Sequence, residues 1–189
     1  RQVAFWVYHG MKSLFLQDAD ALVLRTDDLV DILSHALRKF PTIERVTTYS
    51  RSQTVCRKSP EELARLRAAG LSRVHIGMES GSDAVLGLVN KGVTADEQIR
   101  AGQNLIAAGF ELSEYFMPGL GGAALSRENA LESARVLSAL NPTFIRIRST
   151  VPVPGTPLHD MMPDRWEPLT EEGKVRELRL FIESLSGIT

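Results

Sequence analysis

Cysteine is almost absent from this sequence: Cys56 is the only one in 189 residues. One thiol cannot form an internal disulfide, and a structural zinc site or an iron-sulfur cluster needs several thiolates. The four histidines show no metal-ligand spacing either. The sequence therefore predicts a cytoplasmic protein whose own residues hold no metal.

Long apolar runs and an excess of one charge are also missing. No stretch approaches the roughly 18 uncharged apolar residues of a membrane span, and the N-terminus lacks a signal-peptide pattern. The 22 basic and 23 acidic residues nearly cancel. No membrane partner is expected, and a nucleic-acid partner is neither implied nor excluded. Because the chain begins with Arg1 instead of Met, we expect further sequence upstream.

Short β-rich runs alternate with longer segments of helical periodicity, which is the main structural signal. The expected strands are 13–16, 43–49, 73–78, 110–117 and 144–150. Spacings of about 30 residues or more between strands suit parallel β-α-β crossovers. With 43% hydrophobic residues, the chain predicts one α/β domain over residues 1–189. An incomplete (β/α) barrel fits best, and a flavodoxin-like sheet is the alternative.

Capping signals delimit the expected helices. Thr26 is the expected N-cap of a helix that runs to Lys39. Capping boxes are expected at Ser59 with Glu62 and at Thr94 with Glu97. The remaining expected helices are 83–89, 126–140 with Ser126 as its cap, and 170–185.

Each expected strand ends in a polar or glycine-containing cluster. The clusters are Gln17, Asp18 and Asp20; Tyr49, Ser50 and Arg51; Glu79 and Ser80; Met117 to Gly122; and Arg146, Arg148 and Thr150. Any single cluster is ordinary turn chemistry. Five in succession favour a ligand site, because the carboxyl ends of parallel strands meet at one edge.

Four ordered blocks resemble the core of the radical S-adenosylmethionine (SAM) superfamily, in its MiaB/NifB-like branch. They are "FLQDADAL", "RVHIGMESGSDAVLGLVNKG", "EYFMPGLGG" and "FIRIRSTVPVPGTPL". The likeness covers about residues 13–160, followed by a helical segment over 165–189. It implies a partial (β/α)6-type TIM-like barrel with parallel strands, whose first strand-helix unit is missing.

The resemblance also implies SAM as a cofactor and assigns residues to it. The backbone of Gln17, Asp18 and Ala19 would face the SAM amino group, although many members carry a GGE-type segment there. Glu79, beside Ser80, would accept from the ribose hydroxyls, and Lys91 would pair with the SAM carboxylate. Without the resemblance, Glu79 is a carboxylate favoured by a helix dipole, and Lys91 is a solvated lysine.

Further assignments follow from the same resemblance. The segment with Met117 and Gly119 would pack on adenine, unless it is only a tight turn. Arg146 and Arg148 lie two apart on a strand and face one side, either toward substrate or SAM or outward into surface pairs. One of Tyr49, Ser50 and Arg51 would lie near SAM or substrate; Tyr49 and Arg51 are the candidates.

The family's CxxxCxxC loop, which holds a 4Fe-4S cluster, is not in this sequence. The resemblance therefore implies a fragment, inactive by itself, of an enzyme that reductively cleaves SAM to a 5′-deoxyadenosyl radical, with the cysteine loop upstream of Arg1. An electron donor and an unidentified substrate would be its partners. Without the first strand an edge is exposed, so a homodimer through that edge is expected.

Two other functions remain open. A cluster-free module of the same descent could bind SAM or a nucleotide without radical chemistry. An unrelated metal-dependent (β/α) hydrolase or lyase could use Asp18, Asp20 and Glu79 as acid, base or metal ligands.

Overall fold

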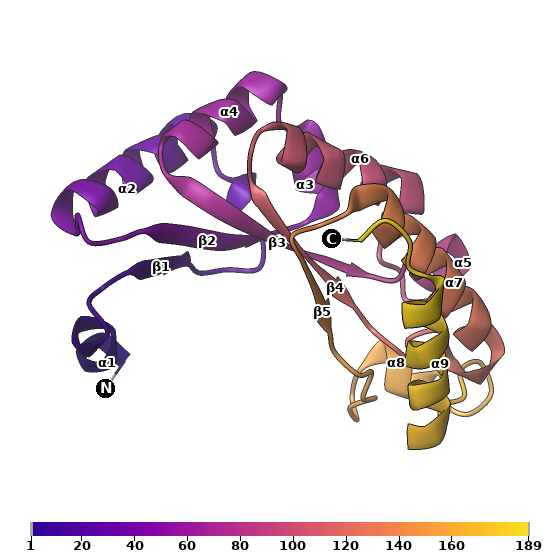
Figure 1. The fold of residues 1–189 in the computed structure, drawn as a ribbon. Helices are drawn as coiled ribbons and strands as arrows, with labels where there is room; N and C mark the ends of the chain where they lie inside the picture. The colour runs from indigo at the N-terminus through magenta and orange to yellow at the C-terminus, as the bar shows by residue number, and fades with distance from the viewer. Residues whose placement is uncertain (1, 189) are drawn as a thin grey trace. The chain divides into compact units, whose positions relative to one another are not determined.

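A single parallel sheet organises the chain in the computed structural model, which describes residues 2–188 (Figure 1). The strand order is β1-β2-β3-β4-β5. The strands are β1 (Ser13–Leu16), β2 (Arg45–Ser50), β3 (Leu71–Glu79), β4 (Glu111–Phe116) and β5 (Phe144–Ile147). The predicted α/β class and parallel pairing are confirmed.

Helices separate the strands in the sequence. They are α1 (Gln2–Tyr8), a short 3-10 helix η1 (Ala21–Val23), α2 (Thr26–Lys39), α3 (Ser52–Arg57), α4 (Pro60–Ala68), α5 (Asp83–Leu88), α6 (Ala95–Ala107), α7 (Gly122–Leu140), α8 (Pro157–Asp160) and α9 (Glu171–Ser184). The sequence did not predict α1, α3, α8 or η1, each of which spans seven residues or fewer.

Both predicted capping boxes are present. Ser59 accepts from the Glu62 amide and Glu62 accepts from the Ser59 amide, at 3.2 and 2.9 Å. Thr94 and Glu97 make the same reciprocal pair at the start of α6. The Thr26 cap was predicted wrongly: Arg25 is the N-cap, and the Thr26 hydroxyl instead donates to Glu62 across 2.6 Å.

Helix α7 begins four residues earlier than predicted, so Ser126 is not its cap. Its first turn incorporates the glycine-rich segment, where the Ala123 amide donates to the Glu167 carbonyl at 2.9 Å. The Ser126 hydroxyl donates to Glu177 instead. A tertiary partner therefore extends the helix beyond the residue that local capping rules select.

Strand β5 ends earlier than predicted, at Ile147. Beyond it, the Arg148 amide donates to the Phe116 carbonyl at 3.0 Å and the Thr150 amide to the Pro118 carbonyl at 3.1 Å. The chain after β5 thus follows the end of β4 and the loop beyond it.

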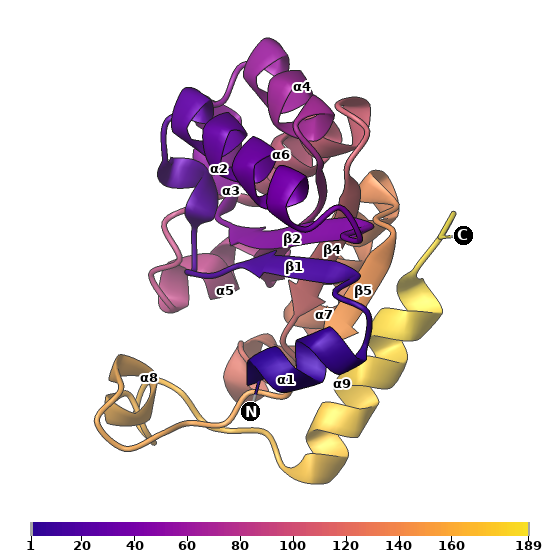
Figure 2. The same cartoon turned by 90° about the vertical axis from the view of Figure 1, so that its left-hand side faces the viewer.

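The chain divides into two compact units. The first contains the residues up to Ile76 together with Arg100–Ser113, and the second contains Gly77–Ile99 and the residues from Glu114 onward. In the first unit, α2 packs against α4, and β1 pairs with β2 from Ser13 opposite Arg45 (Figure 2). Its core gathers fully buried side chains, among them Leu29, Leu33, Val55, Leu66, Val74 and Leu105.

The second unit has a core of its own. Helix α9 lies along α7 (Figure 1). Phe181 of α9 stacks on Phe116 of β4 with ring centroids 4.2 Å apart. Met78, Val136 and Leu137 are fully buried in the same cluster. The ends of β3 and β4 are thereby fixed within this unit.

Candidate functional site

The predicted site residues fall into the two units. The first unit holds Gln17, Asp18, Ala19, Tyr49 and Arg51, and the second holds Glu79, Ser80, Lys91, Met117, Gly119, Arg146 and Arg148.

The segment after β1 is exposed and sharply turned. Asp18 has φ +94°, a conformation that side chains other than glycine rarely adopt. Its carboxylate accepts from the Ala19 amide at 2.6 Å, which stabilises the turn locally. Where many members of the family have a GGE-type segment, this chain has Asp18, whose side chain binds the backbone of the next residue. Roles for Gln17, Asp18 and Ala19 in binding a ligand stay predictions.

Asp20 binds the loop that follows β2. Its carboxylate accepts from the Ser50 hydroxyl at 2.8 Å, the Arg51 amide at 3.2 Å and the Thr54 hydroxyl at 2.6 Å. A carboxylate with three donors holds a loop in place and has little capacity left for a metal or for proton transfer. This arrangement argues against the hydrolase alternative, which needed Asp20.

Tyr49 lies among rings of the first unit. Its ring centroid is 5.1 Å from that of Phe15 and 5.4 Å from that of His75. Arg51, by contrast, is exposed. Their roles near SAM or substrate stay predictions, with the aromatic row as the setting of Tyr49.

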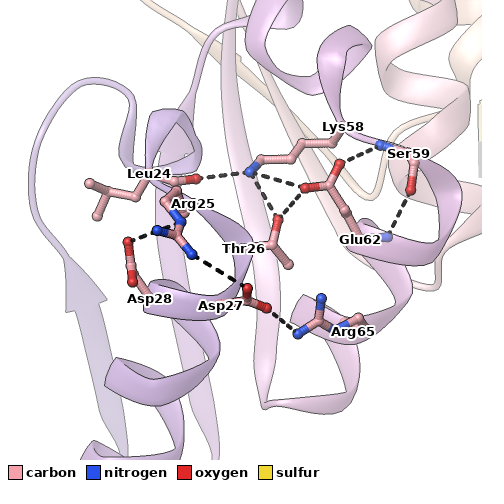
Figure 3. Close-up of polar contacts among 9 residues, drawn as sticks. All are labelled: Leu24, Arg25, Thr26, Asp27, Asp28, Lys58, Ser59, Glu62 and Arg65. Carbon is pink, nitrogen blue, oxygen red and sulfur yellow. Dashed lines mark hydrogen bonds and ion pairs between the residues drawn. The ribbon is translucent and has the colours of Figure 1, made fainter.

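A second polar cluster of the first unit joins the start of α2 to the start of α4 (Figure 3). Lys58 donates to the Leu24 carbonyl at 2.8 Å and the Thr26 hydroxyl at 3.0 Å, and its Nζ lies 3.7 Å from Glu62 Oε1. The Thr26 hydroxyl bond, followed by the Ser59 amide, lowers the pKa of Glu62. Every group here is used within the cluster, so it is structural.

The strongest candidate site lies at the end of β3, in the second unit. Glu79 has φ +66°, and its carboxylate returns over the backbone of Gly77. Lys91, after α5, places Nζ 3.4 Å from Glu79 Oε1. A methyl group at position 77 would overlap the Glu79 carboxylate and lie 3.3 Å from Lys91 Nζ. A side chain at position 77 would therefore displace the Glu79 carboxylate from its observed place.

Glu114 of β4 is the ionisable neighbour that sequence reasoning missed. Glu114 is 1% exposed, and its Oε2 has no hydrogen-bond partner among the residues that the structure describes. Burial raises the pKa of Glu114 well above its usual range, and the charge of Glu79 raises it further while Lys91 opposes. A glutamate inside a run of buried strand positions was the signal available in the sequence.

The "ESGS" loop after β3 is held against α7. The Gly81 amide donates to the Ser133 hydroxyl at 2.8 Å, and a side chain at 81 would meet the α7 backbone, with Ser133 Cα 2.7 Å away. Ser80 is fully buried, and its hydroxyl accepts from the Ser82 amide at 3.0 Å. Ser80 stays a predicted ligand contact, although its hydroxyl serves the loop itself.

Glu177 of α9 organises the glycine-rich loop. It accepts from the Gly119 amide at 2.9 Å, the Asn129 side chain at 2.7 Å and the Ser126 hydroxyl. Asn129 also donates to the Met117 carbonyl at 3.1 Å. The Gly119 amide is therefore engaged, and any contact of Met117 and Gly119 with adenine stays a prediction.

Arg146 and Arg148 share one aromatic neighbour. Their guanidinium carbons lie 6.0 and 5.5 Å from the centroid of Tyr115, within the range of cation–π contact. The prediction that both face one side is consistent with this shared ring. Both are exposed, so their charges can meet an anionic group.

The residues present do not fit an iron-sulfur cluster. Cys56 sits in α3, partly buried against the first core, and within residues 2–188 no three His, Cys, Asp or Glu side chains gather as metal ligands. The Glu79–Lys91 pair does suit an adenosyl amino acid, because a carboxylate can accept from two hydroxyls and an ammonium can bind a carboxylate. Across the described part of the chain, none of the helices is long and apolar enough to span a membrane.

Comparisons with known proteins show the family of the chain. The family model described as the radical SAM superfamily matches residues 6–134. The tRNA uridine(34) acetyltransferase of Methanocaldococcus infernus is 25% identical over 104 residues, which is 54% of this chain and 20% of that protein.

Solved structures share the fold. Elp3 of the archaeon M. infernus, solved without its N-terminal residues, has a TM-score of 0.74 at 17% identity, covering 95% of this chain and 47% of that one. Coproporphyrinogen III oxidase (HemN) from Escherichia coli has a TM-score of 0.73 at 16% identity, covering 91% and 39%. The chain thus spans less than half the length of these relatives, and the likeness supports the predicted partial TIM-like barrel.

Proposed function

The chain belongs to the radical SAM superfamily, and from this membership we propose that it is the SAM-binding part of an enzyme that cleaves SAM to a 5′-deoxyadenosyl radical. The observation that carries the proposal is the Glu79–Lys91 pair folded over Gly77 at the end of β3. This pair occupies the two positions that the resemblance assigns to the ribose hydroxyls and the SAM carboxylate.

Each residue of the pair has a separate task. Glu79 accepts hydrogen bonds from the ribose, and its left-handed backbone directs the carboxylate back over the strand end. Lys91 supplies the positive charge for the amino-acid carboxylate. The Glu79–Lys91 distance of 3.4 Å exceeds the usual 2.7–2.9 Å of a charge-assisted hydrogen bond, so both groups can exchange partners at modest cost.

The cluster must come from residues outside this sequence, because one cysteine cannot supply three thiolates. When bound, SAM and a reduced 4Fe-4S cluster would together supply the radical chemistry. The residues of this chain bind and orient the ligand. We accordingly propose that residues 1–189 alone are inactive and that the cysteine loop precedes Arg1 in the complete protein.

The substrate and the branch of the family stay proposals. The structural likenesses above are to Elp3 and HemN, whereas the sequence blocks resemble the MiaB/NifB-like branch. The tRNA named for the M. infernus relative is a candidate substrate, but the match covers only 20% of that protein. Exposed Arg146 and Arg148 offer positive charge for a phosphate-bearing substrate.

Calorimetric titration of this chain with SAM tests the proposal. We expect saturable binding that Lys91→Met weakens about tenfold, because a hydrogen bond to a charged group contributes about 1.5–3 kcal/mol. Glu132→Gln is the control, since Glu132 pairs with Arg135 on α7, outside the site. Absence of SAM binding by the wild-type chain would refute the proposal.

A cluster-free binding module predicts the same titration, so a second assay separates the two. The complete protein, reconstituted anaerobically with iron and sulfide, should release 5′-deoxyadenosine from SAM when an electron donor is supplied. Binding without release would favour the module. Family membership and the engaged carboxylate of Asp20 weigh against the unrelated hydrolase.

The homodimer is a separate proposal. Strand β1 ends the strand order, and a parallel edge strand can pair with a second copy. Light scattering of the chain should give the mass of a dimer, and a monomer at high concentration would contradict it.

A further inference from the structure

Glu114 is a buried acid, and the neighbouring Glu79–Lys91 pair does not explain why the fold keeps an acid at this position. It is 1% exposed in a strand whose other members from Leu112 to Phe116 are also buried. Its Oε2 has no partner among the described residues. A buried carboxyl oxygen left without a hydrogen bond costs folding free energy, so its retention calls for a reason.

The surroundings place Glu114 beside the Glu79–Lys91 pair. The end of β4 is joined to the end of β3 by the Met117 amide, which donates to the Glu79 carbonyl at 2.9 Å. The charges that act on Glu114 are those of Glu79 on β3 and Lys91 after α5. Two carboxyls and one ammonium therefore form one electrostatic group.

One distribution of the proton and the charges over Glu79, Lys91 and Glu114 is favoured. Two carboxylates close together cannot both ionise easily. Burial raises the pKa of Glu114, so the proton resides there, and Glu79 carries the negative charge opposite Lys91. A protonated carboxyl can donate one hydrogen bond, and an ionised one cannot.

We propose that Glu114 is a positioning residue: it holds Glu79 in place by a hydrogen bond when Lys91 turns from Glu79 to the carboxylate of the ligand. The inference rests on the proposed function, since it needs a ligand that recruits Lys91. Once Lys91 leaves, Glu79 has no cation, and the carboxyl of Glu114 donates its free hydrogen bond to it. Glu79 then stays oriented over Gly77, toward the ribose hydroxyls.

The test compares SAM binding by the wild-type chain, Glu114→Leu and Glu114→Gln between pH about 6 and about 9, the range in which buried glutamates can titrate. Leucine fills the space but donates nothing, so SAM affinity should fall about tenfold. Glutamine can still donate at every pH, and it should rescue binding at neutral pH. Wild-type affinity should decline toward alkaline pH relative to Glu114→Gln, because ionised Glu114 stops donating.

A second ligand sharpens the test. 5′-Deoxyadenosine has no carboxylate, so Lys91 stays with Glu79, and Glu114→Leu should change its affinity less than twofold. A role in packing alone would weaken both ligands equally and leave the pH profiles parallel.

The outcomes separate the two proposals. If the wild-type chain does not bind SAM, the proposed function fails. If it binds SAM, and Glu114→Gln shows the same alkaline decline as the wild type, the inference about Glu114 fails while the proposed function stands. If Glu114→Leu does not fold, the pH profile of Glu114→Gln still decides. Glu132→Gln serves as the control throughout, because its pair with Arg135 lies on the surface of α7.

Discussion

The Lys58–Glu62 pair of the first unit and the Lys91–Glu79 pair of the second are both partly buried, but they differ in whether the polar groups around them have hydrogen-bond partners. Lys58 and Glu62 of the first unit lie 3.7 Å apart, and Lys91 and Glu79 of the second lie 3.4 Å apart. Around Lys58 the neighbouring polar groups donate and accept among themselves (Figure 3). In the group that contains Lys91, Oε2 of Glu114 is left without a partner within residues 2–188.

We propose that this difference separates a structural cluster from the cluster proposed to bind SAM. A network whose members satisfy one another gains free energy on folding and has nothing to offer a ligand. A group that leaves a buried oxygen unpaired loses stability and recovers it only when a partner arrives. The distance between the charges does not distinguish the two pairs. What distinguishes them is whether each neighbouring polar group has a hydrogen-bond partner.

Lys58→Met should give the largest effect and should act on stability alone. The Lys58 side chain is only 10% exposed, so its loss leaves the Leu24 carbonyl without the lysine donor and Glu62 without its nearby cation. We expect the free energy of unfolding to fall by about 3 kcal/mol in urea denaturation, with SAM affinity unchanged. Lys12→Met, in an exposed pair with Glu44, is the control and should cost less than about 1 kcal/mol.

Gly77→Ala should break the other pair. The added methyl group overlaps the Glu79 carboxylate, so the pair must move. SAM affinity should fall by at least about tenfold, or about 1.4 kcal/mol, in calorimetry. Gly87→Ala in α5 is the matched control, because a methyl group there meets nothing within 4 Å. Equal affinities of the two variants would show that the Glu79–Lys91 geometry is unimportant.

Glu114→Gln should stabilise the chain at neutral pH. A carboxyl whose pKa is raised in the folded state contributes stability below its unfolded pKa, and that contribution is lost as pH rises to the folded pKa. The variant lacks this dependence, so its advantage should grow with pH above about 4.3, by at most about 1.4 kcal/mol per pH unit. Urea denaturation at several pH values measures it, and a constant difference would mean that Glu114 is ionised when folded.

Thr26→Val should have the smallest effect on stability, and it should destabilise the chain, in contrast to Glu114→Gln. The hydrogen bond from the Thr26 hydroxyl is the main cause of the lowered pKa of Glu62. A carboxyl with a lowered pKa stabilises the folded state above its unfolded pKa of about 4.3, and this stabilisation is lost as pH falls through the lower folded pKa. The variant should lose about 0.5 to 1 kcal/mol at neutral pH, discounted because Glu62 is 36% exposed. The loss should shrink in acid, and thermal unfolding at neutral and acid pH would show it.

Much of the fold could be predicted because its signals are local. Ser59 with Glu62 and Thr94 with Glu97 set helix starts through bonds that span three residues. Alternating strands and helices dictate parallel pairing, since a crossover of that length returns the chain in the same direction. Thr26 and Ser126 were misjudged because distant carboxylates, Glu62 and Glu177, take their hydroxyls.

By itself the sequence determined the α/β class, the parallel strands and the likeness to a known family, from which the predicted roles of Glu79 and Lys91 follow. Only the tertiary structure decided that Asp20 is engaged by three donors and that Glu114 is buried with its Oε2 lacking a partner in the described part of the chain. The physical reason is range. Helix caps and strand periodicity depend on neighbours in the sequence, whereas the protonation and availability of a carboxyl depend on groups that folding brings from other segments.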